Sequence, residues 1–111
     1  MKSRSAKNKG VRLQNQTVKD LYEAFSNLRD GDIKPAVMGE SGVDIILSPH
    51  AKDLIPLNIE CKNQERLNIW EAMKQAEDNA EGRIPCTVFK RNRSETYACI
   101  KWKDLLNLLN D

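Results

Sequence analysis

Two carboxylates and a lysine occur in the middle of this chain in a pattern that suits phosphate chemistry. Glu60 and Lys62 stand on either side of Cys61 at the end of the segment LNIECK, and Asp44 occurs earlier, in VDIILS. Side chains alternate along a β-strand, so Glu60 and Lys62 would project from the same face, roughly 6–7 Å apart. If the two segments pair as strands, Asp44 can lie on that face as well.

Converging carboxylates repel each other, and a divalent cation removes that cost. Mg²⁺ prefers oxygen ligands with water and phosphate in the remaining positions, and Mn²⁺ could replace it. Such an ion polarises a phosphodiester, offsets the charge of the transition state and generates hydroxide near neutral pH. Lys62 would position or activate the attacking water, or stabilise developing charge. The alternative is a surface ion pair between Glu60 and Lys62 worth under ~1 kcal/mol.

The helices that would support this site follow from the hydrophobic pattern. Apolar residues spaced three and four apart, from Val18 to Leu28, predict a helix that begins after Gly10. Extending its apolar stripe back by one turn reaches Gln14, which either marks an exposed first turn or points into a site. A second helix is predicted over residues 67–81 and a third over 103–110.

The strands are indicated by β-branched residues and by alternation. Residues 43–48 and 57–62 read as two strands that pair as a hairpin, with residues 49–56 as a turn between them. Residues 29–42 contain Asp-Gly and a proline and read as a break after the first helix. The segments PCTVFK and TYACIKW are typical of two further strands.

This order of elements predicts an α/β fold with a central mixed sheet of about four strands flanked by helices. The chain has 111 residues, and we assign residues 11–111 to a single domain and residues 1–10 to a flexible basic arm. No apolar run reaches the ~18 residues of a membrane span, and the first residues lack the apolar core of a signal peptide. A cytoplasmic protein without a membrane partner is therefore expected.

Basic residues form two clusters that could bind a polyanion. The net charge is only +2, yet no acidic residue occurs before Asp20. Such clusters are often only a solvated face, but two of them in a short chain favour a nucleic-acid partner. The candidate DNA-binding residues are Lys7, Lys9, Arg12, Lys90, Arg91 and Arg93.

The three cysteines, Cys61, Cys86 and Cys99, lie in strand-like segments without a Cys-x-x-Cys pattern. Buried free thiols are therefore expected, in preference to zinc ligands or disulfides. The single histidine, His50, cannot form a histidine-rich metal site and is predicted to lie in a surface loop.

The segments GVDIILS and NIECK resemble the signature of the PD-(D/E)xK nucleases. Asp44 matches the first acid of that signature, Glu60 the second acid and Lys62 the lysine, while Val43 stands where the formal proline would be. The predicted order of elements is also similar to the restriction-endonuclease-like core, over most of residues 10–101. The resemblance implies that Asp44, Glu60 and the carbonyl group of Cys61 bind the metal.

Two glutamines complete the resemblance. Many members of the superfamily carry a glutamate on the first helix, where this chain offers Gln14, which cannot supply charge. Gln75 is the counterpart of a glutamine on the helix after the lysine, or else an ordinary exposed amide. The stretches GESGVDIILSP, IECKNQE and VFKRNRS are similar to small nucleases carried by bacteriophages, some of which resemble Holliday-junction resolvases.

The expected function is metal-dependent hydrolysis of DNA, with branched or non-specific DNA as the substrate. The alternatives are a sequence-specific nicking or homing-type endonuclease, and an inactive DNA-binding protein on the same fold, which Gln14 would suit. Paired cuts would require a homodimer, with Leu108 as the candidate interface residue. Glu40 is a candidate extra ligand, although an exposed acid in a turn is the favoured interpretation. Trp70 is predicted to be a core residue rather than a base-stacking one.

Overall fold

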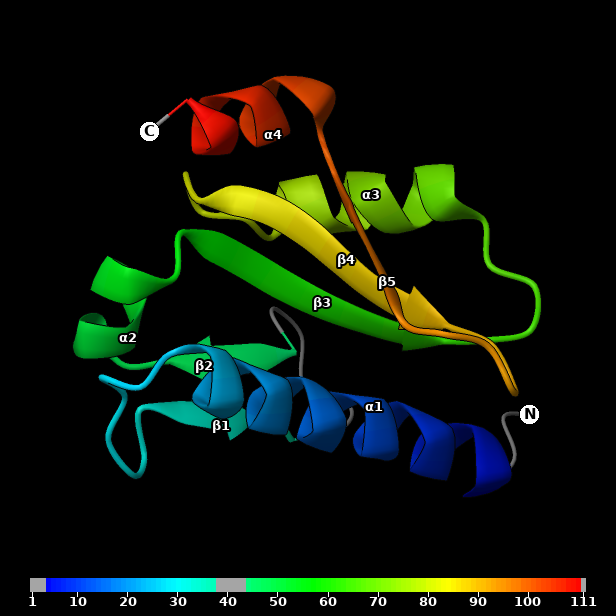
Figure 1. Cartoon of the computed structure of the whole chain (residues 1–111). Coiled ribbons are helices and arrows are strands. Elements are labelled where there is room, and N and C mark those ends of the chain that lie inside the picture. The colour runs from blue at the N-terminus through cyan, green and yellow to red at the C-terminus, as the bar shows by residue number, and fades with distance from the viewer. Residues whose placement is uncertain (1–3, 38–43, 111) are drawn as a thin grey trace.

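The computed structural model describes residues 4–37 and 44–110, so Glu40 lies outside the described residues. The chain folds into four helices and five strands within these ranges (Figure 1). In chain order the elements are α1 (Arg4–Ala24), β1 (Ile33–Pro35), β2 (Ile45–Leu47), α2 (Pro49–Leu54), β3 (Leu57–Asn63), α3 (Ile69–Asp78), β4 (Ile84–Lys90), β5 (Tyr97–Ile100) and α4 (Trp102–Leu109).

The strands form two separate sheets. In the larger one the order is β3-β4-β5, with β3 and β4 parallel and joined through α3, and with β4 and β5 antiparallel. In the smaller one β1 pairs with β2 in antiparallel fashion. The predicted α/β class and mixed sheet are confirmed. The predicted central sheet of about four strands is wrong, because the structure divides five strands into sheets of three and two.

The predicted hairpin of β2 with β3 is also wrong, because β2 pairs with a strand that the sequence did not reveal. That strand, β1, is only three residues long and ends in Pro35, and proline is tolerated at strand ends and edges rather than within a ladder. It forms because Ile33 and Ile45, which are 4% and 2% exposed, both enter the core.

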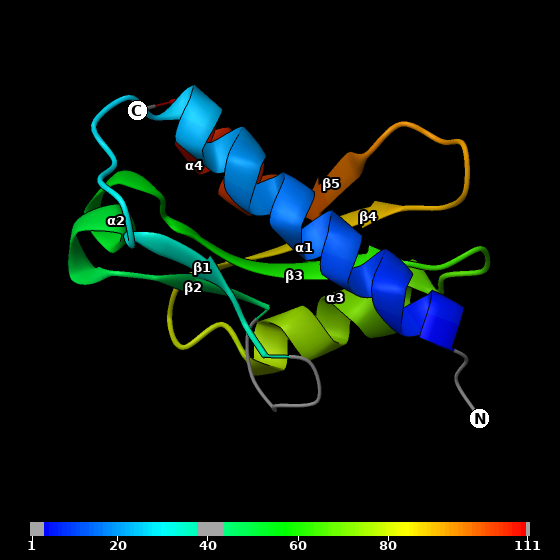
Figure 2. The ribbon, with the colours of Figure 1, turned by 90° about the horizontal axis from the view of Figure 1, so that it is seen from below.

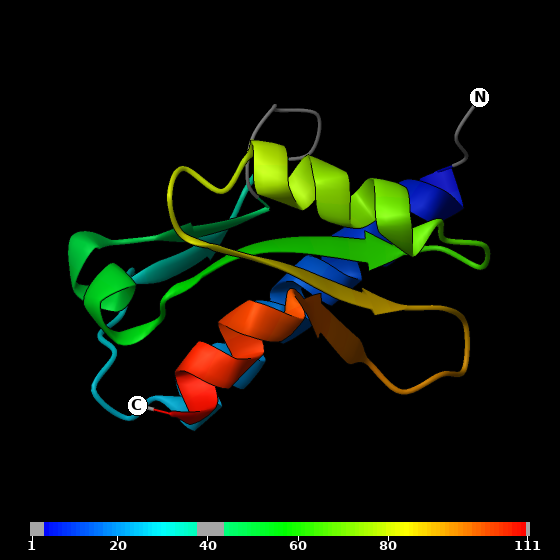
Figure 3. The ribbon, with the colours of Figure 1, turned by 90° about the horizontal axis from the view of Figure 1, so that it is seen from above.

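Helices α1 and α3 cover opposite faces of the larger sheet. The Cys61 thiol lies 3.5 Å from the Thr17 hydroxyl of α1, whereas the next residue back, Glu60, contacts Asn79 at the end of α3. Figures 2 and 3 show the two sides: α1 crosses the sheet on one, and α3 and α4 lie on the other. The main core is on the α1 side, where Leu13, Ile59 and Cys86 are buried together.

The first helix begins earlier than predicted. Residues 4–10 belong to α1, so the prediction of a flexible arm was wrong for this stretch. Ala6, Lys7 and Lys9 are good helix formers, and the single glycine, Gly10, costs only about 1 kcal/mol relative to alanine. This part of α1 also contacts the larger sheet, because the Asn63 side-chain amide of β3 donates a 3.1 Å hydrogen bond to the carbonyl oxygen of Lys9.

A short helix, α2, replaces the predicted turn over residues 49–56. Its start is fixed by Ser48, whose hydroxyl oxygen accepts a 3.1 Å hydrogen bond from the Ala51 N–H, and by Pro49 in the first helical position. His50 is therefore a helical residue rather than a loop residue. Its Nε2 atom lies 3.0 Å from the carbonyl oxygen of Asn27.

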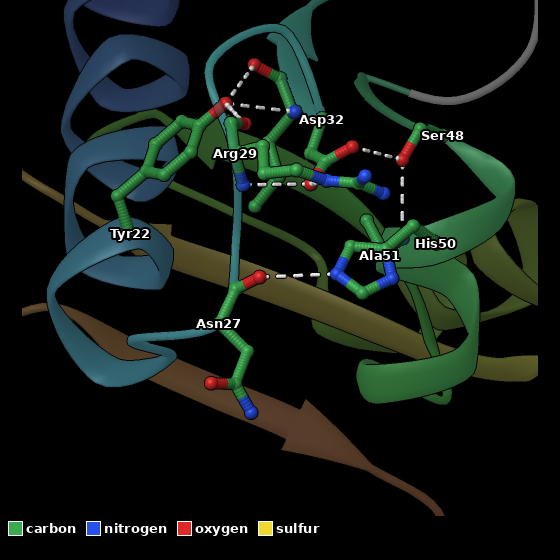
Figure 4. A network of polar contacts seen from close by, with 8 residues as sticks. Tyr22, Asn27, Arg29, Asp32, Ser48, His50 and Ala51 are labelled. Atoms are coloured by element: carbon green, nitrogen blue, oxygen red, sulfur yellow. Dashed lines mark hydrogen bonds and ion pairs between the residues drawn. The ribbon is translucent and has the colours of Figure 1, made fainter.

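A network of polar contacts holds α1, the β1 strand and α2 together (Figure 4). The Tyr22 hydroxyl accepts a 3.0 Å hydrogen bond from the Ile33 N–H. The Asp32 carboxylate accepts bonds of 2.7 Å from the Arg29 N–H and from the Ser48 hydroxyl. These two donors lower the pKa of Asp32 below its ordinary value of 3.8. The network thus fixes the hairpin that carries Asp44.

The cysteines are free thiols, as predicted; Cys61 and Cys86 are buried, and Cys99 is partly buried. Burial raises the pKa of Cys61 to about 12 and that of Cys86 to about 11. Across residues 4–37 and 44–110, no helix has the length and apolar character needed to cross a membrane.

A candidate metal and phosphate site

Asp44 lies at the start of β2, against the edge of β3. Its carbonyl oxygen accepts a 2.8 Å hydrogen bond from the Ala36 N–H of the smaller sheet. Its side-chain Oδ2 accepts a 2.6 Å hydrogen bond from the backbone N–H of Cys61. Asp44 therefore bridges the two sheets, and its carboxylate lies beside the residue that separates Glu60 from Lys62. The predicted convergence of these residues occurs without the strand pairing that was expected to cause it.

Glu60 is a buried acid with one neutral partner. It is 2% exposed, and its Oε2 accepts a 2.9 Å hydrogen bond from the side-chain amide of Asn79. Asn79 caps the end of α3, and its carbonyl oxygen accepts a hydrogen bond from the Asn58 side chain. The sequence reading missed Asn79 as a residue that positions Glu60. The available signal was its place on the polar flank of the helix that follows the lysine.

The environment of Glu60 disfavours its charged form. Burial raises the pKa of the Glu60 carboxyl, and the nearby charge of Asp44 raises it further. The hydrogen bond from Asn79 and the charge of Lys62 act in the opposite direction. Two carboxylates that interact in this way are suited to binding a divalent cation. The charge of the cation would lower the pKa that burial and repulsion raise.

Lys62 and Gln75 line one cavity of about 260 Å³ on the α3 side of the sheet. Lys62 enters it from β3, and Gln75 enters it from the middle of α3. The cavity wall also contains Gln64, Asn68 and Glu71. The structure therefore brings together the predicted lysine and the predicted helix glutamine.

Gln14 is placed differently. It is 4% exposed and belongs to α1, the helix that packs on the sheet from the face opposite α3. Its predicted role in assisting the site stays a prediction. The Cys61 thiol contacts the Thr17 hydroxyl on the α1 side of the sheet, away from Glu60, so only the carbonyl group of Cys61 remains as a candidate ligand beside the carboxylates.

The donor set fits a weakly held hard cation. Among the residues that the structure describes, no group of three or more Asp, Glu, His or Cys side chains could hold a metal ion. Asp44 and Glu60 remain as a pair of carboxylates, and Mg²⁺ commonly binds through one or two carboxylates while keeping several waters. The residues present are thus compatible with Mg²⁺ and unsuited to zinc.

The two basic clusters, which are far apart in the sequence, meet around a second cavity of about 280 Å³. It lies between α1 and the turn that joins β4 to β5, and none of the acidic side chains that the structure describes lines it. We call it the basic cavity; its charged residues are Lys9, Arg12, Lys90 and Arg93. Lys7 lies on α1 and is exposed, and Arg91 lines a neighbouring cavity.

The turn that carries Arg93 has a defined shape. The Ser94 hydroxyl oxygen accepts a 3.0 Å hydrogen bond from the Arg91 N–H, and the Asn92 N–H donates a 2.6 Å bond to Glu65. Arg93 has a φ of 62°, a left-handed conformation that non-glycine residues adopt infrequently. The surrounding bonds hold the arginine in this conformation at the edge of the basic cavity.

Two predictions about surface residues need correction or remain open. Trp70 was predicted to be a core residue, but it is 85% exposed, because α3 buries Ala72 and Ala76 against the sheet instead. On α4, Leu108 is partly buried, whereas Leu106 and Leu109 are 43% and 72% exposed. A homodimer stays a prediction.

No family model, no curated protein and no solved structure matches this chain. Its function therefore has to be inferred from the residues of the site and from their arrangement.

Proposed function

We propose that the protein is a metal-dependent endonuclease that hydrolyses phosphodiester bonds of DNA. The observation that carries this proposal is the hydrogen bond between Asp44 and the Cys61 N–H. It holds one carboxylate beside a strand on which a buried carboxylate, Glu60, and a lysine, Lys62, share a face. A pair of carboxylates next to an ammonium group at the rim of a polar cavity is an arrangement suited to hydrolysis of a phosphodiester.

Each residue has a role in this proposal. Asp44, Glu60 and the Cys61 carbonyl would hold Mg²⁺ or Mn²⁺, which supplies Lewis-acid activation of the phosphate and of water when it is bound. Lys62 orients the attacking water or stabilises the charge that develops on the phosphate. Gln75 faces the same cavity and can hydrogen-bond a phosphate oxygen or a water. Asn79 keeps the Glu60 carboxylate in place.

The basic cavity supports DNA as the substrate. Four cations line this cavity, with no acidic side chain among the described lining residues, and they provide the sequence-independent attraction by which proteins hold the phosphate backbone. The element order, in which a strand with Glu60 and Lys62 is followed by α3 and a parallel strand, supports a restriction-endonuclease-like core of the PD-(D/E)xK type. Branched or non-specific DNA is the proposed substrate class, because the described chain carries no large insertion for sequence recognition.

A second candidate is a DNA-binding protein that does not cleave. It is favoured by Gln14, which replaces a charged ligand, and by the small number of carboxylates in the described part of the site. This candidate keeps the basic cavity and the fold but assigns no catalytic role to Lys62.

A cleavage assay separates the two candidates. Labelled four-way junction, linear duplex and single-stranded DNA are incubated with Mg²⁺, Mn²⁺ or EDTA, using the wild type, Lys62→Ala and the control Lys103→Ala. The nuclease proposal expects metal-dependent products that Lys62→Ala abolishes and Lys103→Ala leaves unchanged. Cleavage of a single duplex sequence would instead indicate a nicking or homing-type enzyme. Binding without cleavage in every metal would support the non-cleaving candidate.

A further inference from the structure

The pairing of the strands places two aromatic residues in line with Lys62 on one face of the larger sheet. Lys62 on β3 pairs with Phe89 on β4, and Phe89 pairs with Tyr97 on β5. Residues that are directly paired in a sheet project from the same face, so these three side chains form one row across the sheet. The Phe89 and Tyr97 ring centroids are 6.0 Å apart, with an angle of 32° between the ring planes.

This row borders a third cavity, of about 340 Å³, which we call the aromatic cavity. Its walls combine aromatic, cationic and amide groups, and they include Phe89, Tyr97, Lys90, Arg91, Gln64 and Leu67. The volume lies in the range of small-molecule sites. Tyr97 is 58% exposed, so much of its side chain is accessible to a ligand. The acidic wall residue Glu65 is already bonded to the Asn92 N–H.

The aromatic cavity adjoins both sites described above. It shares Gln64 and Leu67 with the cavity of Lys62 and Gln75. It shares Lys90 with the basic cavity. The basic cavity faces α1 and the cavity of Lys62 faces α3, so a nucleic-acid strand that reaches both would pass the aromatic cavity as it rounds the end of the sheet at Lys90.

We propose that the aromatic cavity binds an unpaired nucleobase of the substrate by stacking against Tyr97. A base inside a duplex is stacked on both faces and is closed to a protein ring, whereas an unpaired base offers its face. Arg91 and Lys90 would hold the phosphates that flank this base. This inference rests on the proposed function and narrows its substrate class to DNA with unpaired nucleotides beside the cut, at a branch point, a flap or a single strand.

The test is a binding measurement without a divalent metal, so that cleavage does not contribute. Fluorescence anisotropy in EDTA compares a labelled twelve-thymidine strand with a fully abasic strand of the same length and charge. The wild type is expected to bind the thymidine strand about tenfold more tightly, because base stacking on an aromatic side chain contributes about 1–3 kcal/mol per base. Tyr97→Leu should remove this preference, and Tyr97→Phe should keep it.

Two controls make the result specific. Trp102→Ala removes an aromatic side chain that is 68% exposed on α4, outside the aromatic cavity, and should leave the preference unchanged. Arg91→Ala leaves the Tyr97 ring in place, and should weaken binding of both strands while the preference persists. Thermal unfolding of each variant checks that the fold is retained.

The outcomes distinguish this inference from the nuclease proposal. Equal binding of the thymidine and abasic strands by the wild type, or an unchanged preference in Tyr97→Leu, would overturn the base-binding site even if the protein cleaves DNA in Mg²⁺. A base preference that depends on Tyr97, together with no cleavage in any metal, would uphold the base-binding site and reject the nuclease.

Discussion

The carboxylate of Asp44 accepts a 2.6 Å hydrogen bond from the backbone N–H of Cys61, although the strand that follows Asp44 pairs with β1 and not with β3. A backbone donor has a fixed position in a strand, so the bond sets the orientation of the carboxylate. One consequence is that Asp44 lies close enough to Glu60 for its charge to raise the pKa of the Glu60 carboxyl. The site is therefore built from a contact between two sheets.

Removing the charge of Asp44 tests its role as a ligand. Asn in this position keeps an oxygen that can accept the Cys61 N–H bond, so Asp44→Asn should fold normally. Its single-turnover cleavage rate in Mg²⁺ should fall by about 10²–10³-fold, because a charge that supports the metal is lost. Binding of DNA in EDTA should be unchanged or slightly tighter. Asp104→Asn on α4 is the matched control, and a wild-type rate for Asp44→Asn would remove Asp44 from the mechanism.

Removing the charge of the buried Glu60 side chain is expected to stabilise the folded protein. Glu60 has a pKa raised above its ordinary value of 4.5, so the folded state prefers the protonated form. The stability linked to this group is fully present below about pH 4.5 and is lost as the pH rises through the raised pKa. Glu60→Gln keeps the bond from Asn79 and removes the charge, so its melting temperature at pH 7 without metal should exceed that of the wild type by a few degrees.

Thermal unfolding of both proteins between pH 4 and pH 7 checks this expectation. The difference between them should be small at pH 4 and should grow as the pH rises. Parallel curves over the whole range would show that burial does not penalise the Glu60 charge.

A bound metal should offset the unfavourable free energy of keeping the buried Glu60 carboxylate charged. A ligand that binds only the folded state at ten times its dissociation constant stabilises that state by about 1.4 kcal/mol, which is on the order of 5 °C for a domain of this size. Mg²⁺ should therefore raise the melting temperature of the wild type, and EDTA should restore the original value. Glu60→Gln should lose most of the response, and Glu23→Gln, an exposed residue of α1, should keep it. An equal response in all three proteins would place the metal elsewhere.

The sequence predicted that Glu60 and Lys62 share one face of a strand, but it did not predict the strand pairing around them. The spacing of Glu60 and Lys62 defines their shared face in any strand, so their relation did not depend on the sheet order. Asp44 reached them through a side-chain bond to Cys61, which no periodicity indicates. The pairing of β2 with β1 could not be foreseen, because β1 has three residues and follows a turn.

Other differences arise from tertiary packing. Trp70 is exposed because the buried side of α3 consists of alanines, which allow the helix to lie close to a polar sheet face. Met73 and Ala80 do face the sheet, because the Thr87 hydroxyl contacts the Met73 sulfur and Ala80 is 5% exposed, so only the placement of Trp70 was wrong. The meeting of Lys9 with Arg93 depends on how α1 docks on β3, and single segments carry no information about this arrangement.

The basic cavity predicts a specific salt dependence of binding. Each phosphate contact contributes about 0.9 to the slope of log K against log salt concentration for duplex DNA. Arg12→Ala and Arg93→Ala should each lower the slope by about this amount and should weaken binding to all sequences equally. Lys103→Ala, on α4 and outside the basic cavity, should leave the slope unchanged. Titrations at four salt concentrations measure it, and equal slopes for all variants would exclude the cavity as a phosphate site.

The polar network around Asp32 is expected to make the stability of the folded protein sensitive to acid. Asp32 has a pKa lowered by its bonds from the Arg29 N–H and the Ser48 hydroxyl. Its stability contribution is therefore present above the ordinary value of 3.8 and is lost as the pH falls through the lowered pKa. Asp32→Asn should melt several degrees below the wild type at pH 7, and the gap should narrow in acid. Asp53→Asn, an exposed residue of α2, serves as the control; a gap that stays constant with pH would contradict the role of the charge.

The bond between the Asn63 amide and the Lys9 carbonyl joins parts of the chain that are far apart in sequence. Closing such a loop has an entropic cost that must be met before the contact forms, and non-local contacts of this kind slow folding. Asp44, Glu60 and Lys62 come from a shorter stretch of the chain, whereas the basic cavity is lined by residues as far apart as Lys9 and Thr96. Fraying of the first turns of α1 would thus open the basic cavity and leave the carboxylate pair intact, so the proposed DNA binding and the proposed chemistry would be lost separately.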